Sequence, residues 1–244
     1  MWASSPERAA QVDRQRKAGR SHLATIGRVT LVTVDRFSQL RTEYENAPLG
    51  RSSLASDPAQ QFLSWLDEAV AANLDEPNAF VLSTVSTDGA PSSRTLLLKG
   101  LELGGLVFYT NYRSHKARDI EHDSRVSALF LWLPLHRQVR IEGTVEKVDG
   151  ETSDRYFASR PLDARFASAV SPQSQVVAEG QLERLLEDLK ARFPDGNVPR
   201  PAHWGGYRLT PRSYEFWQGR EARFHDRFRY IKAGDGWQID RLAP

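Results

Sequence analysis

The chain of 244 residues contains no cysteine, and this absence removes several kinds of chemistry. Without thiols there is no disulfide framework, no cysteine-ligated zinc or iron–sulfur site and no cysteine nucleophile. The sequence also has no apolar run near the roughly 18 residues of a membrane-spanning helix, and its first residues have no apolar core of the signal-peptide kind. These absences predict a soluble, cytoplasmic protein with no membrane partner.

Common nucleotide- and metal-binding motifs are missing as well. The chain has no G-x-x-x-x-G-K-[ST] loop, no G-x-G-x-x-G turn, no H-E-x-x-H and no G-x-S-x-G. Its six histidines lack metal-ligand spacing, which predicts no metal site: His22, His115, His122, His136, His203 and His225. If the protein binds a phosphorylated molecule, individual Arg, Lys, Ser and Gln side chains must hold it.

Neither positive nor negative charge is in large excess. Lys plus Arg number 33 and Asp plus Glu 31, a formal net charge of +2. This balance argues against nucleic acid as a partner, because binding a long phosphate backbone needs a strong basic excess. It leaves small anions open, since these need only a local cluster of cations. With 40% hydrophobic residues the chain has enough apolar material for a packed core.

Residues 1–35 differ from the rest of the chain. They carry many Arg and Lys residues and little apolar pattern apart from a short run at 29–34. We interpret them as a flexible extension; a targeting peptide is the alternative, but Glu7 and Asp13 weigh against it. Residues 36–244 are predicted to form a single domain.

A helix is predicted from Asp57-Pro58 to about Asn73, with Asp57 as its cap and Pro58 at its first position. From Phe80 the apolar period changes to that of strands separated by turn residues. Strands are expected at 80–86, 92–99, 106–111, 125–133, 138–148, 206–210, 214–217, 227–231 and 237–241, and further helices at 114–122, 150–159 and 182–193. This order predicts a mainly β protein of the α+β class, a closed antiparallel barrel with peripheral helices.

Three segments are candidate anion sites. Arg94-Thr-Leu-Leu-Leu-Lys99 places two cations on one strand, but alternation points them to opposite sides, so by itself the hexapeptide favours strand-end charges reaching into water. Tyr109-Thr110-Asn111 followed by Ser114-His115-Lys116 combines a helix start with hydroxyls and a cation; an ordinary capped helix is the alternative. Tyr156 and Arg160 share a helix face and precede Gln173-Ser174, which suits a phosphate or a simple surface pair.

A fourth segment has fewer ordinary explanations. In Glu215-Phe-Trp-Gln-Gly-Arg-Glu-Ala-Arg-Phe-His-Asp-Arg227, alternation puts Arg223, His225 and Arg227 on one face of a strand or extended loop. Three potential cations in a row repel one another unless an anion or an electron-rich ligand lies among them.

Taken in order, these segments resemble the pyridoxine/pyridoxamine 5′-phosphate oxidase family, from about Arg41 to Pro244. The most specific match runs from Trp204-Gly-Gly-Tyr to Arg227 and closes with Asp240-Arg-Leu-Ala-Pro244. The resemblance implies a split antiparallel β-barrel homodimer with flavin mononucleotide (FMN) between the subunits. It further implies oxidation of pyridoxine or pyridoxamine 5′-phosphate by O2 to pyridoxal 5′-phosphate and H2O2, with ammonia from the amine.

The resemblance also implies site residues. Substrate would be bound by Arg41, Tyr44, Lys99, Tyr156, Arg160 and the position of Ala164, with Arg223 and His225 over the pyridine ring as catalytic residues. FMN would contact Arg94, Thr95, Leu96, Leu97, Leu98, Lys99, Tyr109, Thr110, His115, Lys116, Gln138, Gln173, Ser174, Trp217 and Arg227.

The chain departs from the family pattern at two positions near phosphates. The family usually has Arg where this chain has His115; a neutral imidazole is a weaker phosphate partner than a permanent cation, and Arg113 is a candidate replacement. It usually has Ser where this chain has Ala164, a loss of about 1 kcal/mol if one hydrogen bond disappears. Arg165 or Ser168 could contact the phosphate instead.

Two other functions remain open. One is a paralogous flavin oxidase that acts on another ring, such as a phenazine precursor; Lys99 argues against it, because such relatives tend to lose that lysine. The other is a non-catalytic protein that binds FMN or pyridoxal phosphate, which would not need both Arg223 and His225.

Overall fold

The computed structural model describes residues 25–26, 29–30, 44 and 46–244. Strands β1 (Thr25–Ile26) and β2 (Val29–Thr30) pair antiparallel. The remaining described residues belong to one unit, Tyr44–Pro244. Most of the extension predicted at 1–35 lies outside the described residues, and so does Arg41. None of the helices within the described ranges is long and apolar enough to cross a membrane.

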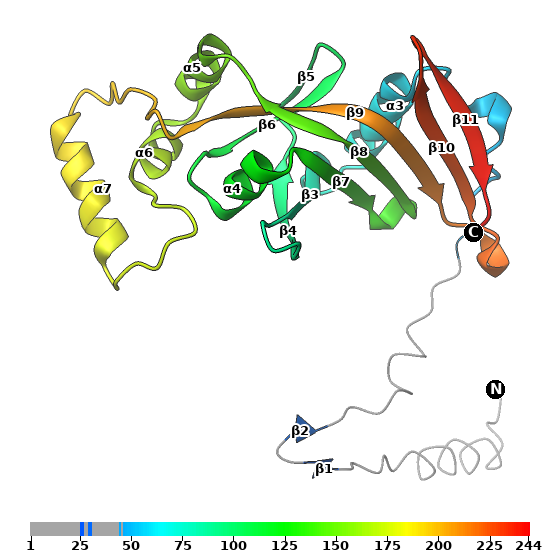
Figure 1. Cartoon of the computed structure of the whole chain (residues 1–244), viewed down its shortest axis with the longest axis horizontal. Coiled ribbons are helices and arrows are strands. Elements are labelled where there is room, and N and C mark those ends of the chain that lie inside the picture. Colours follow the sequence, from blue (N-terminus) through cyan, green and yellow to red (C-terminus); the bar gives the residue numbers. More distant parts are fainter. Residues whose placement is uncertain (1–24, 27–28, 31–43, 45) are drawn as a thin grey trace, which may run out of the picture. The chain divides into compact units, whose positions relative to one another are not determined.

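A curled antiparallel sheet of nine strands forms the body of this unit (Figure 1). Its main path runs β11-β10-β9-β8-β7-β3-β4, and β6 joins β5 to the side of β9. The bounds are β3 Ala79–Val85, β4 Pro91–Leu97, β5 Gly100–Glu102, β6 Gly105–Asn111, β7 Arg125–Trp132, β8 Arg137–Lys147, β9 Trp204–Gln218, β10 Asp226–Ala233 and β11 Gly236–Leu242. The mainly β class is confirmed. The closed barrel expected from the pattern is wrong, because among the described residues β4 pairs with β3 alone.

The longest strand was expected as two. β9 runs unbroken from Trp204 to Gln218 and pairs with β8 along most of its length (Figure 1). On its other edge it pairs first with β6 and then with β10. Pro211 lies within this strand at a register shift opposite Gly143, where a β-bulge tolerates a residue without an N–H. One strand therefore links both ends of the sheet.

Gly143 is required at this bulge. A Cβ there would overlap the carbonyl oxygen of Thr210, which belongs to the backbone and cannot rotate away. We expect Gly143→Ala to lower the free energy of unfolding by about 2–4 kcal/mol. Gly100→Ala is the matched control, because a Cβ at Gly100 meets nothing within 4 Å. Urea denaturation of both variants checks this, and equal midpoints would contradict it.

Helix α3 (Pro58–Ala71) covers one end of the sheet. The Asp57 carboxylate accepts a hydrogen bond from the Ala59 N–H (2.8 Å), as the sequence predicted for the cap. Phe62 and Trp65 are fully buried, and the Phe62 ring lies 4.8 Å from that of Phe130 on β7. This apolar face fixes the helix on the curled sheet.

The other helices are α4 (His115–His122), α5 (Gly150–Ser159), α6 (Leu162–Val170) and α7 (Gln181–Arg192). Helix α6 was not predicted: its nine residues follow Pro161, which makes no side-chain cap. Phe157 and Phe166, from α5 and α6, pack with Val198 and Trp204 in a small separate core. This core holds both helices at the start of β9 and so shapes the pocket described next.

Candidate functional site

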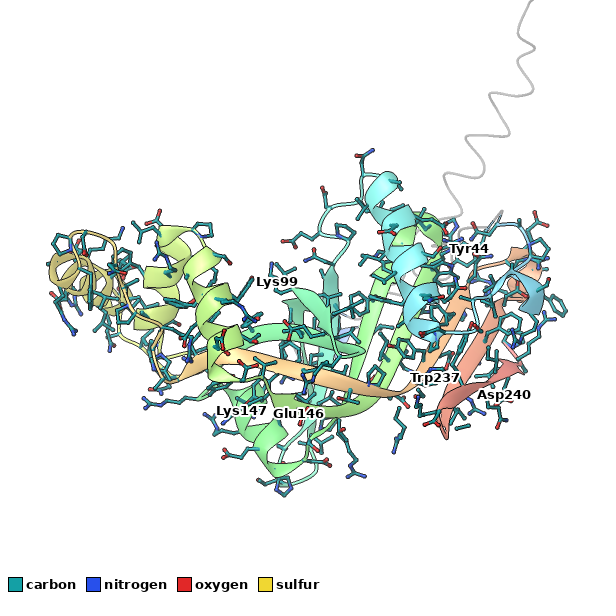
Figure 2. The ribbon with its side chains drawn as sticks, turned by 90° about the horizontal axis from the view of Figure 1, so that it is seen from above. Tyr44, Lys99, Glu146, Lys147, Trp237 and Asp240 are labelled. Atoms are coloured by element: carbon teal, nitrogen blue, oxygen red, sulfur yellow. The ribbon has the colours of Figure 1, made fainter. Side chains whose placement is uncertain are left out.

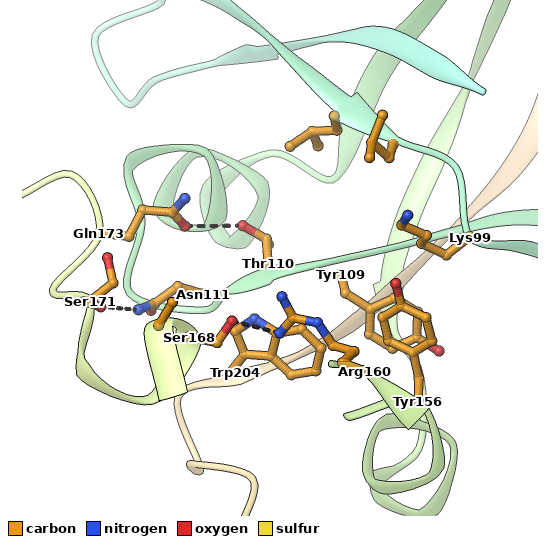
Figure 3. A pocket seen from close by; sticks show the side chains of 13 residues that line it. Lys99, Tyr109, Thr110, Asn111, Tyr156, Arg160, Ser168, Ser171, Gln173 and Trp204 are labelled. Atoms are coloured by element: carbon orange, nitrogen blue, oxygen red, sulfur yellow. Dashed lines mark hydrogen bonds between the residues drawn. The ribbon is translucent and has the colours of Figure 1, made fainter. Parts of the chain in front are cut away.

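A pocket of about 450 Å³ lies at the start of β9, between the β4–β6 strands and helices α5 and α6 (Figure 3). Its lining combines hydroxyls, amides, aromatic rings and two cations. The lining residues are Leu96, Leu97, Lys99, Tyr109, Thr110, Asn111, Tyr156, Arg160, Ala167, Ser168, Ser171, Gln173 and Trp204. Eight of these are predicted site residues, and the sequence also brought forward Asn111, in a candidate anion segment, and Ser168, as a replacement for the hydroxyl missing at Ala164. Sequence reasoning did not single out Ala167, Ser171 or Trp204 as site residues.

Lys99 and Arg160 supply the positive charge of this pocket. Lys99 lies between β4 and β5, and its side chain points into the pocket (Figure 3). Arg160 follows the last residue of α5, and its guanidinium lies 4.8 Å from the centre of the Trp204 ring. Neither cation forms an ion pair with a carboxylate in the described part of the chain. Two unneutralised cations facing one cavity favour an anionic ligand.

Three aromatic rings form one wall of the pocket. The ring of Tyr109 stacks on that of Tyr156 (3.9 Å between centroids) and on that of Trp204 (5.5 Å). Burial raises the pKa of Tyr109 to about 12 and raises the pKa of Tyr156 as well. Both phenols are therefore protonated at neutral pH and act as hydrogen-bond donors to an anion.

A second cation cluster lies at the start of α4. Lys116 is 5% exposed, and its Nζ donates to the hydroxyls of Thr110 (3.1 Å) and Ser114 (3.3 Å). Burial lowers the pKa of Lys116 to about 8, with a smaller contribution from the charge of Arg94. Thr110 also donates to Gln173 Oε1 (3.2 Å), which connects this cluster to the pocket above.

Asp119 organises the cations around Lys116. Its buried carboxylate accepts a hydrogen bond from Thr84 (2.6 Å) and lies 3.8 Å from the Arg94 guanidinium. The exposed imidazole of His115 is 3.7 Å from the same carboxylate. The backbone N–H of His115 donates a hydrogen bond to Ser174 Oγ. Arg94, His115, Lys116 and the first amides of α4 together could hold a phosphate.

Three predicted residues form a row at the other end of β9. Gln138 on β8 and Arg227 on β10 both lie opposite Trp217 in the strand register. They line a separate cavity of about 370 Å³ together with Glu215. The Arg227 guanidinium is 2.8 Å from the Glu215 carboxylate, so this arginine is neutralised.

The alternation expected for Arg223, His225 and Arg227 is wrong. Residues 221–223 form a short 3-10 turn, and Arg223 has a left-handed backbone (φ 63°), so the three side chains do not share one strand face. His225 Nδ1 accepts a hydrogen bond from the Arg220 N–H (3.1 Å). Burial, and then the charge of Arg223, lowers the pKa of His225. The imidazole is thus neutral near pH 7, with its proton on Nε2.

Tyr44 completes this second group. Its ring lies 5.7 Å from that of His225 and 6.1 Å from that of Trp217, while the Arg223 guanidinium lies 6.0 Å from its centre. We call Tyr44, Trp217, Arg223 and His225 the aromatic–cation cluster. Its rings and donors suit a flat polar ring as ligand.

The pocket and the aromatic–cation cluster do not meet within one copy of the chain. Trp204 lines the pocket and Trp217 belongs to the cluster, and roughly 40 Å of extended β9 separates them. Figure 2 shows Lys99 beside the light-green helices and Tyr44 apart from it, on the side where the red strands lie. The predicted residues are therefore assembled into two separate groups rather than one.

Some predicted residues lie elsewhere. Ala164 is on α6 but does not line the pocket, Thr95 is exposed on β4, and Leu98 is buried in the core. Arg113 is exposed, and its charge adds to burial in lowering the pKa of His203, so it lies near that residue.

A curled, open antiparallel sheet that carries two cation clusters fits the split-barrel class of FMN-binding proteins, whose solved structures superpose on this chain. Family models agree: residues 66–186 match pyridoxamine 5′-phosphate oxidase, and residues 204–244 match the pyridoxine 5′-phosphate oxidase C-terminal dimerisation region. The chain belongs to the pyridoxamine 5′-phosphate oxidase family, and it is an FMN-dependent oxidoreductase.

Individual relatives support this membership. A Bordetella petrii protein named pyridoxine/pyridoxamine 5′-phosphate oxidase is 50% identical over 208 residues, covering 85% of this chain and 99% of its own. One of the same name from Salinibacter ruber is 49% identical over 216 residues, covering 86% and 100%. Among solved structures, PhzG from Burkholderia lata, in complex with tetrahydrophenazine-1-carboxylic acid, superposes with a TM-score of 0.78 at 28% identity, covering 83% and 100%.

Proposed function

We propose that the protein oxidises pyridoxine 5′-phosphate and pyridoxamine 5′-phosphate to pyridoxal 5′-phosphate. The alcohol and O2 give pyridoxal 5′-phosphate and H2O2; the amine, O2 and water give the same products plus ammonia. When bound, FMN would supply the redox chemistry that side chains lack, namely a two-electron acceptor for the hydride on the substrate's C4′ carbon that O2 can reoxidise. The protein's task is to bind, orient and protect the substrate. A cytoplasmic location stays a prediction.

The observation that carries this proposal is the pocket with Lys99, Tyr156 and Arg160. Its two cations balance the two negative charges of a phosphate monoester, and a neutral phenol adds a donor. The aromatic wall gives room for a ring attached to that phosphate. A substrate without a phosphate would leave both charges unpaired.

The cluster around Lys116 fits the FMN phosphate. A buried ammonium with hydroxyl partners and no carboxylate partner in the described residues is costly unless an anion lies beside it. We assign Arg94, His115, Lys116 and Ser174 to that phosphate. Leu96, Leu97, Tyr109, Thr110 and Gln173 then face the flavin side of the pocket.

A second copy of the chain would complete the site. The match of residues 204–244 to a dimerisation region supports a homodimer. We propose that FMN lies between the subunits, where the aromatic–cation cluster of one copy meets the pocket of the other. Arg223 and the neutral His225 would then hold the substrate ring, and the flavin would also contact Gln138, Trp217 and Arg227. Tyr44, and Arg41 outside the described residues, would cover the substrate.

Oxidation of a phenazine precursor is the second candidate, because a structure superposing at a TM-score of 0.78 is PhzG with a tetrahydrophenazine carboxylic acid. Lys99 and Arg160 favour the phosphate substrates, since a single carboxylate would leave one cation unpaired.

Steady-state oxidation tests the choice of substrate. We expect both phosphates to be oxidised with release of H2O2, and unphosphorylated pyridoxine to have a kcat/KM at least about 100-fold lower, because roughly 3 kcal/mol of charge-assisted binding is lost. Faster oxidation of tetrahydrophenazine-1-carboxylic acid than of either phosphate would contradict the proposal. FMN binding without turnover of any of these would indicate a non-catalytic protein.

The lowered pKa of Lys116 predicts a pH-dependent affinity for FMN. The phosphate dianion of FMN favours the charged Lys116 ammonium. Above pH 8, however, Lys116 is deprotonated in most of the FMN-free protein. Binding must then take up a proton, so the Kd of FMN should rise above pH 8 by up to about tenfold per pH unit. Flavin fluorescence titrations between pH 7.5 and 9.5 measure this. Lys116→Arg stays charged and should remove the slope; an equal slope in both proteins would refute the assignment.

A further inference from the structure

The phosphate end of the pocket contains the hydroxyl of Ser168, one of the two replacements that the sequence offered for the missing hydroxyl at position 164; the other, Arg165, does not line the pocket. Ala164 and Ser168 are one helical turn apart on α6, and residues at this spacing share a helix face. Ala164 has no polar side-chain atom and does not line the pocket, whereas Ser168 does. The hydroxyl that the family pattern places at position 164 is therefore found one helical turn later, at Ser168.

Ser168 is bonded to one of the two pocket cations. Its Oγ accepts a hydrogen bond from Arg160 NH1 at 2.6 Å, which Figure 3 shows. This bond uses a lone pair of the oxygen and leaves the O–H free to donate. No acceptor for that O–H is found in the described residues.

The bond also fixes Arg160. The guanidinium is held on one side by the Trp204 ring and at NH1 by Ser168, so its remaining N–H groups keep a set direction. Lys99 and Tyr156 face the same cavity. Around Arg160 the donors that we assign to the phosphate are two cations, the Tyr156 phenol and the Ser168 hydroxyl, which match the several acceptor oxygens of a phosphate monoester.

We propose that Ser168 donates a hydrogen bond to the substrate phosphate and orients Arg160 toward it, replacing a hydroxyl at position 164. This inference rests on the proposed phosphate substrate and adds a residue that determines its affinity. Its effect is confined to ligands that carry the phosphate, and it leaves the flavin and the reacting carbon untouched.

Equilibrium binding of pyridoxal 5′-phosphate to the FMN-loaded protein tests this. We expect Ser168→Ala to raise the Kd of pyridoxal 5′-phosphate about tenfold and to leave that of pyridoxal, which lacks the phosphate, within twofold. In turnover, KM for pyridoxine 5′-phosphate should rise while kcat stays within about twofold. Ser168→Thr retains the hydroxyl and should restore most of the affinity.

Ser159→Ala is the matched control. Ser159 is the exposed neighbour of Arg160 on α5, and its hydroxyl donates to the Tyr156 carbonyl oxygen, outside the pocket lining. The Ser159→Ala variant should bind pyridoxal 5′-phosphate and pyridoxal with the same Kd as the wild type. An unchanged Kd for pyridoxal 5′-phosphate in Ser168→Ala would overturn the inference, as would an equal loss for pyridoxal, which would indicate a merely structural role.

The outcomes separate this inference from the proposed reaction. If the wild type oxidises pyridoxine 5′-phosphate and Ser168→Ala binds pyridoxal 5′-phosphate normally, the inference fails and the reaction stands. If the wild type binds the phosphate through Ser168 but oxidises neither substrate, the reaction fails and the inference stands. A wild type that does not bind pyridoxal 5′-phosphate overturns both.

Discussion

Arg160→Met should lower kcat/KM for pyridoxine 5′-phosphate by about 10- to 150-fold, mostly through KM. The guanidinium is one of two cations in the pocket, and hydrogen bonds to charged groups are worth about 1.5–3 kcal/mol. Methionine keeps much of the apolar contact with Trp204, so the change removes charge more than packing. Initial rates of H2O2 release at varied substrate concentration measure the effect.

The control for this variant lies on α5, the helix that ends one residue before Arg160. Arg155 is an exposed arginine of α5 that pairs with Glu151, four residues before it, and does not line the pocket. Arg155→Met should leave kcat/KM within about twofold, because exposed ion pairs contribute little. The FMN content of the wild type, Arg160→Met and Arg155→Met should be equal. A loss in Arg160→Met that appears wholly in kcat would count against a phosphate-binding role.

Two inactive variants should restore activity when they are combined in one dimer. A Lys99→Met/Arg160→Met subunit lacks the pocket cations, and an Arg223→Met/His225→Ala subunit lacks the groups of the aromatic–cation cluster. In a dimer with two shared sites, one site of the mixed dimer carries all four changes and the other carries none. Mixed dimers should therefore have about half of the wild-type activity, although both parents are nearly inactive.

Co-expression with two different affinity tags and purification over both gives these mixed dimers. Dimers purified in the same way from two Lys99→Met/Arg160→Met subunits are the control and should stay inactive. If each subunit built its whole site alone, both sites of the mixed dimer would be damaged. Activity no higher than that of the parents would then contradict the shared site.

Much of the fold could be predicted from the sequence, because its strands have one buried and one exposed face. β3 and β7 alternate between buried and less buried residues as the period of two requires, and their bounds lie close to the expected ones. The prediction failed where long-range pairing overrides a local signal. Pro211 is a strand breaker in isolation, but the bulge opposite Gly143 accommodates it inside β9.

The candidate site was less accessible to sequence reasoning. The left-handed backbone at Ala222 and Arg223 falls on residues that rarely adopt it, so nothing in the local pattern indicated a turn there. Ser168 and Trp204 are common residue types on a short helix and a strand end, and only the tertiary packing of α5, α6 and β9 brings them to Arg160. The alternation of buried and exposed residues along the strands did not indicate that the pocket and the aromatic–cation cluster would lie at opposite ends of β9.

The most direct test of the account is to mix the FMN-loaded protein with pyridoxine 5′-phosphate in the absence of oxygen and to follow the flavin absorbance. We expect the yellow colour to bleach and to return when air is admitted, with one pyridoxal 5′-phosphate formed per flavin. This result would also show that His115 and Ala164 are compatible with catalysis. A flavin that stays yellow at saturating pyridoxine 5′-phosphate and pyridoxamine 5′-phosphate would contradict the proposed function.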